Sequence, residues 1–513
     1  NSRAQASLGL HLLRTGDETA ARAALDVAFA LDPFDTVTYN LLSMLDTLDA
    51  FVTVPGDNLT VRMDPQDAPV LQPYLLPLAE QALAALSARY EFTPQGPVLV
   101  EVFPKHDDFA VRTMGLPGML GALGACFGRV VTMDSTRARP PGSFNWAATL
   151  WHELAHVVTL QMSGNRLPRW LSEGISTYEE SRAQPAWGNE SELLFAQAHA
   201  AGRLIPLTDL NSGFTRLETI NLAYHQASVI VAFLVETQGQ DALIRFIRSF
   251  GEGIGEEAAL TRIYGRTWAA LQPEFDAYVT RRYGALAPAL AEVNDPPPPR
   301  AADAAAWSAF ADRHAGNFRI QMAAASPLMR LGDLDATRRV LERAATLVPF
   351  ATGEDSPWRL LVTVALKQQR PEDARRFLQE VLQRDHTAAQ PMRQWLGLAR
   401  EAGDAVQRQR VAERLIEIDP FDAGAHSALG ELALARGDLP LALRELQTAV
   451  DAGPPNPAEA LTSLAEVSLK SGERAAAKRH LIRALEATPR YERAQDLLLQ
   501  VIEDGPVGGA MRP

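Results

Sequence analysis

Small and apolar residues recur at fixed intervals after a turn glycine near both ends of the chain. Counting from Gly437, small or apolar residues stand 5, 9 and 12 positions later, and a proline stands 17 positions later. The same spacing follows Gly16, Gly332 and Gly472. The glycine turns the chain, the small residues let two helices approach, and the proline ends the second helix. The pattern therefore predicts helical hairpins.

Two of these hairpins, and a weaker one before them, follow one another at a regular interval. Their turn glycines, Gly403, Gly437 and Gly472, lie 34 and 35 positions apart. This interval resembles that of the tetratricopeptide repeat, a unit of two helices. The pattern weakens in the unit of Gly403 and further at residues 369–381. A generic alanine-rich helical bundle is the alternative interpretation.

The pattern changes between the two blocks of hairpins. Short apolar runs predict strands at residues 51–54, 59–62, 98–103 and 127–133, and longer runs predict helices at residues 70–90 and 144–162. Further helices follow up to Gly284, and a run of four prolines occupies residues 296–299. Because a polyproline segment is stiff, this run predicts a spacer between domains.

The expected fold is mostly helical, with an α+β core flanked by tetratricopeptide-type hairpins. A length of 513 residues exceeds what a single core usually holds, so several domains are expected. The patterns divide the chain into N-terminal repeat-like helices at 1–50, an α+β domain at 51–288, a proline-rich linker at 289–304, a C-terminal repeat domain at 305–504 and a tail at 505–513.

Charge and composition narrow the choice of partners. The chain has a net charge of −13, so it lacks the excess of Lys and Arg that would neutralise phosphates. This argues against nucleic acid as a partner. No apolar run approaches the roughly 20 residues that cross a bilayer. Cys126 is the only cysteine, so an intrachain disulfide and a thiolate zinc cage are excluded. The compartment stays open: periplasmic or secreted if a bacterial signal peptide has been removed, and otherwise cytoplasmic.

The predicted helix at residues 144–162 carries two histidines in the arrangement His-Glu-x-x-His. His152 and His156 lie one turn apart on the same face, so both imidazoles can reach one zinc ion. Glu153, beside the first histidine, can take a proton from water. The alternative is an accidental pattern in a core or solvated helix. The apolar neighbours Leu150 and Leu154 favour a buried active-site helix.

A catalytic zinc ion takes three protein ligands and keeps one open position, so a third ligand is required. The metzincin spacing needs glycine at position 159 and histidine at position 162, which hold Thr159 and Met162. Downstream, Pro168 suits the start of a second helix, and that helix would carry Glu173. Glu173 is therefore the predicted third ligand, with Glu179 or Glu180 as substitutes if Glu173 lies on the surface.

The sequence His-Glu-Leu-Ala-His followed by Leu-Pro-Arg-Trp-Leu-Ser-Glu-Gly resembles the gluzincin branch of the MA clan of zinc peptidases. It is most similar to the peptidase MA-like domains that bacteria often join to tetratricopeptide repeats. The resemblance covers residues 51–284 and is most specific at residues 146–180. It implies a Zn²⁺ ion held by His152, His156 and Glu173, with Glu153 as the catalytic base.

One position departs from the family pattern. Gluzincins often carry a carboxylate four residues after the glutamate ligand, which orients the first histidine, and this chain has Thr177 there. The Thr177 hydroxyl, Glu179 or Glu180 would have to replace it. The family also uses a tyrosine or histidine of a later helix to stabilise the oxyanion. Tyr224 is the candidate for that role, and a buried structural tyrosine is the alternative.

These residues predict a zinc-dependent peptidase whose repeats recruit a protein substrate or partner. The alternatives are a repeat scaffold that carries an inactive or regulatory peptidase-like domain, and hydrolysis of a non-peptide bond. Endopeptidase activity is expected, because residues 121–128, where aminopeptidases of this branch carry an amine-binding glutamate, contain no acid. An amine-binding carboxylate from elsewhere, such as Asp134, would instead indicate an aminopeptidase.

Overall fold

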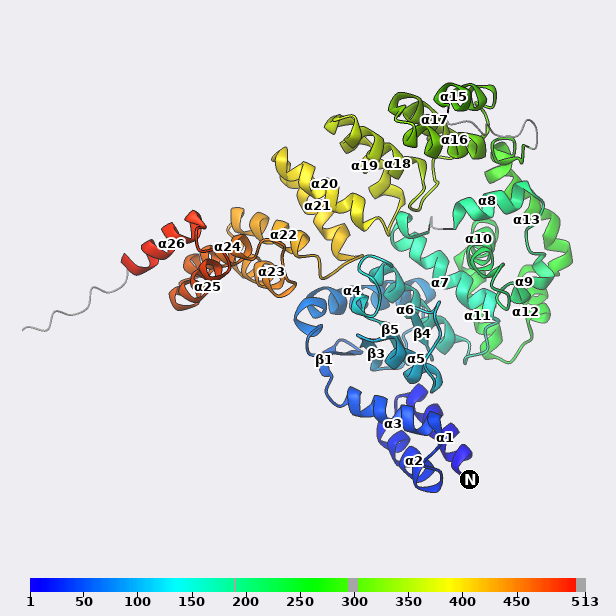
Figure 1. Cartoon of the computed structure of the whole chain (residues 1–513). Coiled ribbons are helices and arrows are strands. Elements are labelled where there is room, and N and C mark those ends of the chain that lie inside the picture. Colours follow the sequence, from blue (N-terminus) through cyan, green and yellow to red (C-terminus); the bar gives the residue numbers. More distant parts are fainter. Residues whose placement is uncertain (189–190, 294–302, 504–513) are drawn as a thin grey trace, which may run out of the picture. The chain divides into compact units, whose positions relative to one another are not determined.

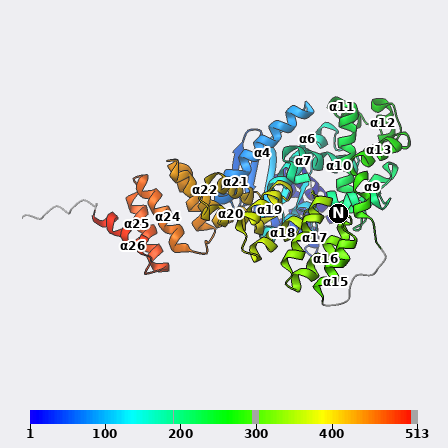
Figure 2. The same cartoon turned by 90° about the horizontal axis from the view of Figure 1, so that it is seen from above.

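The computed structural model describes residues 1–188, 191–293 and 303–503 (Figures 1 and 2). The chain divides into two compact units, residues 1–388 and 389–513. The run of prolines at 296–299 and the predicted tail at 505–513 lie outside the described residues. In the part of the chain that is described, each helix is too short or too polar to span a membrane.

A five-stranded sheet forms the α+β core of the first unit. Its order is β1-β2-β3-β5-β4, with β2, β3 and β5 parallel and the two edge strands antiparallel to their neighbours. The strands are β1 (Val52–Gly56), β2 (Leu59–Met63), β3 (Val98–Phe103), β4 (Gly124–Cys126) and β5 (Val130–Asp134). The first three predicted strands are confirmed. The fourth, predicted at 127–133, begins three residues later, and the glycine-rich stretch before it contains the additional edge strand β4.

The two faces of the sheet pack against different helices. Successive side chains of a strand point to opposite faces, so Glu101 and Phe103 of β3 share one face while Val100 and Val102 share the other. The face of Phe103 contacts the N-terminal helices and α5 (His106–Met114). The other face contacts α4 (Ala68–Tyr90) and α6 (Trp146–Met162), which also pack against each other.

The N-terminal helices and the sheet share a single apolar core. Helices α1 (Ser2–Thr15), α2 (Glu18–Leu31) and α3 (Thr36–Leu48) supply part of it. The cluster joins buried side chains from these helices to side chains of β3 and α5, including Leu13, Leu25, Leu41, Phe103 and Phe109. Beside it, Arg112 and Glu101 form a fully buried ion pair at 2.7 Å. Ala122 and Ala125, at edge strand β4, pack against the same cluster.

Helices account for the rest of the first unit. After α6 come α7 (Arg169–Ala183), α8 (Glu192–Ala200), α9 (Leu210–Gly213), α10 (Ile220–Gln238), α11 (Gln240–Gly251), α12 (Glu256–Tyr264), α13 (Trp268–Tyr283) and α14 (Ala287–Leu290). Short 3₁₀ turns lie between them, of which η2 (Pro185–Gly188) follows α7. Helix α15 (Ala304–Arg313) then precedes two hairpins, α16 (Phe318–Arg330) with α17 (Leu334–Leu347) and α18 (Pro357–Lys367) with α19 (Pro371–Arg384).

The second unit consists of three helical hairpins and a final helix. The pairs are α20 (Ala389–Glu401) with α21 (Ala405–Ile416), α22 (Ala423–Ala435) with α23 (Leu439–Asp451), and α24 (Pro457–Lys470) with α25 (Arg474–Ala487), followed by α26 (Glu492–Glu503). Every predicted turn glycine has a positive φ, between 66° and 84°, at Gly16, Gly332, Gly403, Gly437 and Gly472. Glycine adopts this conformation at little cost, which explains why the spacing begins there.

Candidate metal centre

The two histidines lie in the middle of α6, which is buried on nearly all sides. Asn145 caps the start of this helix, and its side-chain oxygen accepts a hydrogen bond from the Ala148 N–H at 3.0 Å. Strands β4 and β5 contact one side of α6, and α4 and α7 contact other parts of it. This packing holds the predicted ligands on a rigid element.

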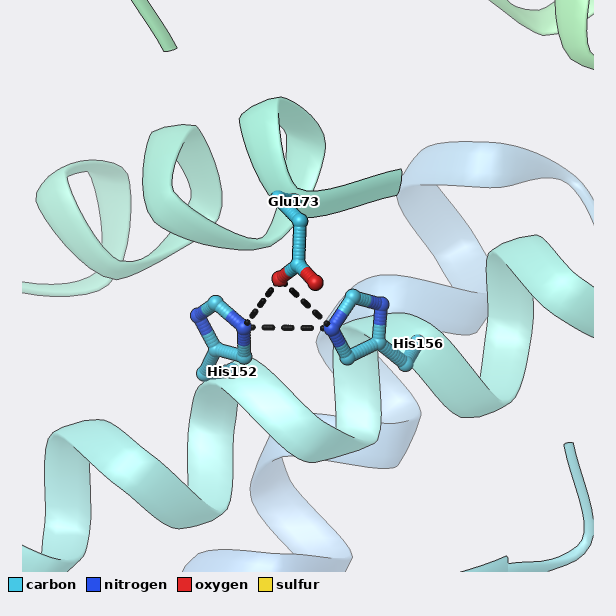
Figure 3. A group of neighbouring side chains, drawn as sticks. All are labelled: His152, His156 and Glu173. Carbon is cyan, nitrogen blue, oxygen red and sulfur yellow. Dashed lines mark hydrogen bonds and ion pairs between the residues drawn. The ribbon is translucent and has the colours of Figure 1, made fainter. Parts of the chain in front are cut away.

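The side chains of His152, His156 and Glu173 converge on one point (Figure 3). The two Nε2 atoms lie 3.1 Å apart, and Glu173 Oε2 lies 3.3 Å from Nε2 of His152 and 3.4 Å from Nε2 of His156. Tetrahedral zinc bonds of about 2.0 to 2.1 Å separate neighbouring ligand atoms by about 3.3 to 3.4 Å. The observed spacings match such a tetrahedron, and two nitrogens and a carboxylate oxygen are donors that zinc accepts.

Hydrogen bonds to the other imidazole nitrogens orient both rings. Glu180 Oε1 lies 2.6 Å from Nδ1 of His152, and the Ser172 hydroxyl lies 3.0 Å from Nδ1 of His156. Burial lowers the pKa of His152, but the hydrogen bonds to Glu173 and Glu180 outweigh it and raise the pKa well above its usual value. With Nδ1 engaged, each ring presents Nε2 to the metal position.

Glu180 therefore supplies the carboxylate that Thr177 cannot supply. Glu179, the other candidate, is fully buried on a different side of α7, where the Tyr90 hydroxyl donates to it at 2.8 Å and Arg89 also binds it. Neither Glu179 nor Glu180 takes the place of Glu173 in the convergent group.

Close packing of α7 against α10 brings Glu173 into position. A Cβ atom on Gly174 would lie 2.8 Å from the backbone of Ala227, so only glycine permits this approach. Pro168 precedes the first turn of α7, as predicted, and Asn211 accepts a hydrogen bond from the Trp170 N–H at 3.1 Å. The Trp170 indole packs edge-on against Trp268, with ring centroids 5.2 Å apart. The helix that carries the third ligand is thus fixed at its start and along its length.

Tyr224, on α10, faces the same cleft as the three convergent side chains. Its ring centroid lies 6.5 Å from that of His152 and 5.1 Å from that of Phe214. Burial and the nearby charge of Glu173 raise the pKa of the phenol, so the group stays protonated and can donate a hydrogen bond. His225, its neighbour, points elsewhere: it is buried against Phe195, and burial lowers its pKa to about 4.

Glu153 lies against the edge strand β4. Its side chain is only 5% exposed, and its Oε2 atom has no hydrogen-bond partner within the described part of the chain. Burial raises the pKa of this carboxyl, and the two histidines offset part of the rise. A desolvated carboxylate without a donor is a stronger base than one in water, which suits proton abstraction.

Gly124 makes room for this carboxylate. A Cβ atom at that position would lie 2.5 Å from Oε1 of Glu153 and 2.7 Å from its Cγ. We therefore expect Gly124→Ala to displace Glu153 and to lower any hydrolytic rate by about 100-fold, since small errors in the position of a catalytic group are that costly. Gly121→Ala is the matched control, because the space around its Cβ is open. Equal rates for the two variants would show that the contact with Glu153 is unimportant.

The sequence model of the Peptidase MA superfamily matches residues 79–281, which include every residue of this centre. Residues 79–281 form a peptidase MA superfamily domain. None of the curated proteins matched the chain.

The solved structures that match parts of this chain include TPR proteins and a hydrolase. The TPR protein YrrB is 15% identical with a TM-score of 0.31, over 38% of this chain and 98% of its own. MamA is 18% identical with a TM-score of 0.28, over 34% of this chain and 94% of its own. Yeast LTA4 hydrolase is 15% identical with a TM-score of 0.30, over 79% of this chain and 67% of its own.

A cleft of about 530 Å³ opens over the candidate centre of the peptidase MA domain. Among the described residues that line it, the acids are Glu153, Glu173 and Glu180, all of which belong to the centre itself. Asp134 lies outside the cleft. It is fully buried and is paired with Arg139 at 2.7 Å and with His106 at 2.9 Å.

Strand β4 borders the cleft with a free edge. The Asp134 N–H donates a backbone hydrogen bond to the Leu123 oxygen, and the Phe127 N–H donates one to the Val130 oxygen. In an antiparallel pair, alternate residues direct their backbone groups away from the partner strand, so Gly124 and Cys126 direct theirs to the open edge. Within the glycine-rich stretch 121–128, residues 124–126 thus form an edge strand, and turn or bend residues lie on either side of it.

Several residues of the centre and of the cleft above it were not predicted from sequence. Ser172 and the packing role of Gly174 depend on the exact rotation of α7, and the contact of Gly124 depends on the path of β4. His386 and Thr387, which also line the cleft, come from the turn after α19. They lie more than 200 positions from the motif, and no local pattern indicates them.

Proposed function

We propose that the chain is a zinc-dependent endopeptidase. The observation that carries the proposal is the convergence of two imidazole nitrogens and a carboxylate oxygen at tetrahedral spacing, next to a buried carboxylate in an open cleft. His152, His156 and Glu173 would hold the zinc ion. When bound, zinc supplies Lewis acidity toward the scissile carbonyl and toward water.

The remaining chemistry belongs to the chain's own residues. Glu153 accepts the proton of the attacking water and passes it to the nitrogen of the leaving amine, so one carboxylate serves as base and then as acid. Its burial against β4 keeps bulk water from competing for that proton. Tyr224 donates its hydroxyl proton in a hydrogen bond to the oxyanion that develops on the carbonyl oxygen.

Tyr224→Phe is expected to lower kcat by about 10- to 1,000-fold with little change in KM, because the hydrogen bond forms only in the transition state. The ring still packs against Phe214, so the fold is retained. Steady-state kinetics on one peptide measure the effect. A variant with the wild-type kcat would assign Tyr224 a purely structural role.

The free edge of β4 suits an extended peptide that runs through the cleft in both directions. Backbone groups of Gly124 and Cys126 can pair with such a peptide by strand addition. A free substrate amine would need a carboxylate partner. Among the described residues that line the cleft, each acid already has another proposed role: Glu173 binds the metal, Glu180 orients His152, and Glu153 is the base. Asp134 is committed to Arg139 and His106. These features support an endopeptidase.

The test compares one cleavable peptide with a free and with an N-acetylated amino terminus, incubated with the zinc-loaded chain. Internal cleavage of both at similar rates, abolished by a zinc chelator, is the expected result. A strict requirement for the free amine would exclude an endopeptidase. Absence of cleavage in either peptide and in an unfolded protein would exclude a peptidase.

We also propose that the repeats of the second unit bind a protein partner or substrate. A groove of about 520 Å³ runs along α20, α22 and α24. Its arginines are each paired with an acid, such as Arg393 with Asp419 and Asp422 at 2.6 Å and Arg408 with Glu431 at 2.6 Å. A surface with balanced charge and small residues suits a peptide rather than a polyanion.

A further inference from the structure

Arg169, the first residue of α7, lines the cleft over the candidate centre. It is the one arginine or lysine among the described residues of that lining. Its side chain is 52% exposed, so much of it is accessible to a ligand. The three glutamates of the lining already have roles in the proposed reaction, whereas this positive charge has none.

Three neighbours hold the guanidinium of Arg169 in place. Its Nε atom lies 3.6 Å from Oε1 of Glu173, which is one helical turn further along α7. The guanidinium carbon lies 5.3 Å from the centre of the Phe214 ring, and that ring packs edge-on against Tyr224 with centroids 5.1 Å apart. Burial and the charge of Glu173 raise the pKa of the Tyr224 phenol, and a hydrogen bond from Arg169 offsets part of the rise. The cation is therefore held beside a predicted metal ligand and the proposed oxyanion donor.

These contacts leave donor groups of Arg169 for a ligand. A guanidinium carries five N–H donors in one plane. Phe214 has no conventional acceptor atom, and the two oxygens that face the guanidinium, one of Glu173 and one of Tyr224, are fewer than its donors. The 3.6 Å separation from Glu173 exceeds an ordinary hydrogen bond, so this ion pair is loose. The remaining N–H groups suit a carboxylate, which can accept two of them in parallel.

The charges of the cleft do not repel an acidic peptide once the metal site is filled. Glu173 directs Oε2 to the two histidines, 3.3 and 3.4 Å away, and Oε1 to Arg169. When Glu173 binds a metal ion, it shares its charge with that ion and neutralises Arg169 less. Three carboxylates, one guanidinium and a divalent cation also leave the described lining without a net charge. Arg169 is then the point of the lining that attracts a substrate carboxylate.

The neighbours of Arg169 determine which part of a substrate it can reach. Glu173 belongs to the metal centre, and Tyr224 is the proposed donor to the oxyanion of the scissile carbonyl. An extended peptide advances about 3.3 Å per residue, so only the residues next to the scissile bond lie beside these two groups. A group that Arg169 binds therefore belongs to a residue that flanks the bond.

We infer that Arg169 determines specificity, by binding the carboxylate of an aspartate or glutamate that flanks the scissile bond. This inference rests on the proposed peptidase activity. Glutamate and glutamine have nearly the same shape but differ in charge, so they form the discriminating pair of substrates. The free carboxyl end of a peptide has the same chemistry, and the experiment separates the two sources.

The test uses the full chain loaded with zinc and denatured casein as the first probe, with the cleavage sites located by mass spectrometry. A peptide that spans the best site, with both ends blocked, is then prepared with glutamate or glutamine at each position that flanks the bond. For the wild type, kcat/KM is expected to be about three- to tenfold higher with glutamate at one of these positions. The difference should lie mainly in KM, because the ion pair forms in the ground state as well.

Three variants assign the preference to this side chain. Arg169→Gln should cleave the glutamate and glutamine peptides at equal rates, and Arg169→Lys should retain part of the preference, because it keeps the charge but loses the paired donors. Arg281→Gln is the matched control, because Arg281 is an exposed residue of α13 that does not line the cleft. Its preference should equal that of the wild type.

Two further measurements complete the experiment. Glu153→Gln loaded with zinc should bind the glutamate peptide with a Kd about three- to tenfold lower than the glutamine peptide in calorimetry, without turnover. A peptide that ends one residue after the bond should be cleaved equally with a free and with an amidated carboxyl end. A marked preference for the free end would overturn the assignment to an acidic side chain.

The remaining outcomes separate the inference from the proposed function. Equal cleavage of the glutamate and glutamine peptides by the wild type would overturn the inference and leave the peptidase. An equal loss on both peptides in Arg169→Gln, with the preference kept, would also overturn it, since Arg169 would then act only by positioning Tyr224. A wild type that cleaves nothing would overturn the proposed function and the inference together.

Discussion

Glu153→Gln is expected to keep the zinc ion and the fold but to lower kcat by about 100- to 10,000-fold, the usual contribution of a general base. Glutamine has nearly the same shape as glutamate, so its side chain fits the space beside Gly124. Its amide, however, cannot accept the proton of the attacking water. Metal analysis, circular dichroism and peptide cleavage measure the three properties. If the variant cleaves peptides at a comparable rate, Glu153 is not the base.

The same substitution has a consequence for stability, which provides a control. Burial raises the pKa of Glu153 in the folded, metal-free chain. A carboxyl whose folded pKa lies above its unfolded value stabilises the fold only at low pH, and that contribution is lost as the pH rises through the folded pKa. At neutral pH the ionised Glu153 therefore opposes folding. Metal-free Glu153→Gln should melt at the same temperature as the metal-free wild type or higher, so its inactivity cannot come from unfolding.

His156→Ala is expected to reduce bound zinc from about one equivalent to nearly none and to abolish cleavage, because two protein ligands seldom hold a catalytic zinc ion. Nε2 of His156 lies 3.4 Å from Glu173 Oε2 and 3.1 Å from Nε2 of His152, so its removal opens one corner of the group. Alanine favours helix, so α6 should persist. Metal content after dialysis provides the measurement, with His199→Ala as the matched control. Unchanged zinc in His156→Ala would refute this ligand assignment.

The convergence of His152, His156 and Glu173 could be predicted because much of it depends on short-range geometry. Two histidines four positions apart share a helix face whatever the fold, and Pro168 marks the start of the next helix. Helical rotation could also have identified the partner of His152. At 100° per residue, Glu180 falls about 20° from the direction of Glu173, whereas Glu179 falls about 120° away. The structure has Glu180 at the histidine and Glu179 buried against Tyr90.

The elements that sequence patterns missed depend on contacts between distant segments. Strand β4 has only three residues, two of them Gly124 and Ala125, so no alternation of apolar side chains marks it. Its neighbours Glu153 and β5 determine its path. In hairpin α18–α19 the left-handed turn position is held by Gln369, with a φ of 56°, where the other hairpins have glycine. The weak repeat pattern at residues 369–381 therefore concealed the hairpin whose final turn reaches the cleft.

The apolar core that the N-terminal helices share with the sheet lies directly behind the strand that contacts Glu153. Ala125 packs against the cluster of Leu13 and Phe103 on one face of β4, while Gly124 confines Glu153 on the other. Because these contacts are continuous, the helices of residues 2–48 and the sheet form one cooperative unit, in which loosening the first hairpin costs the burial of fully enclosed side chains. The position of Glu153 is therefore sensitive to strain applied on the face of the sheet opposite α6.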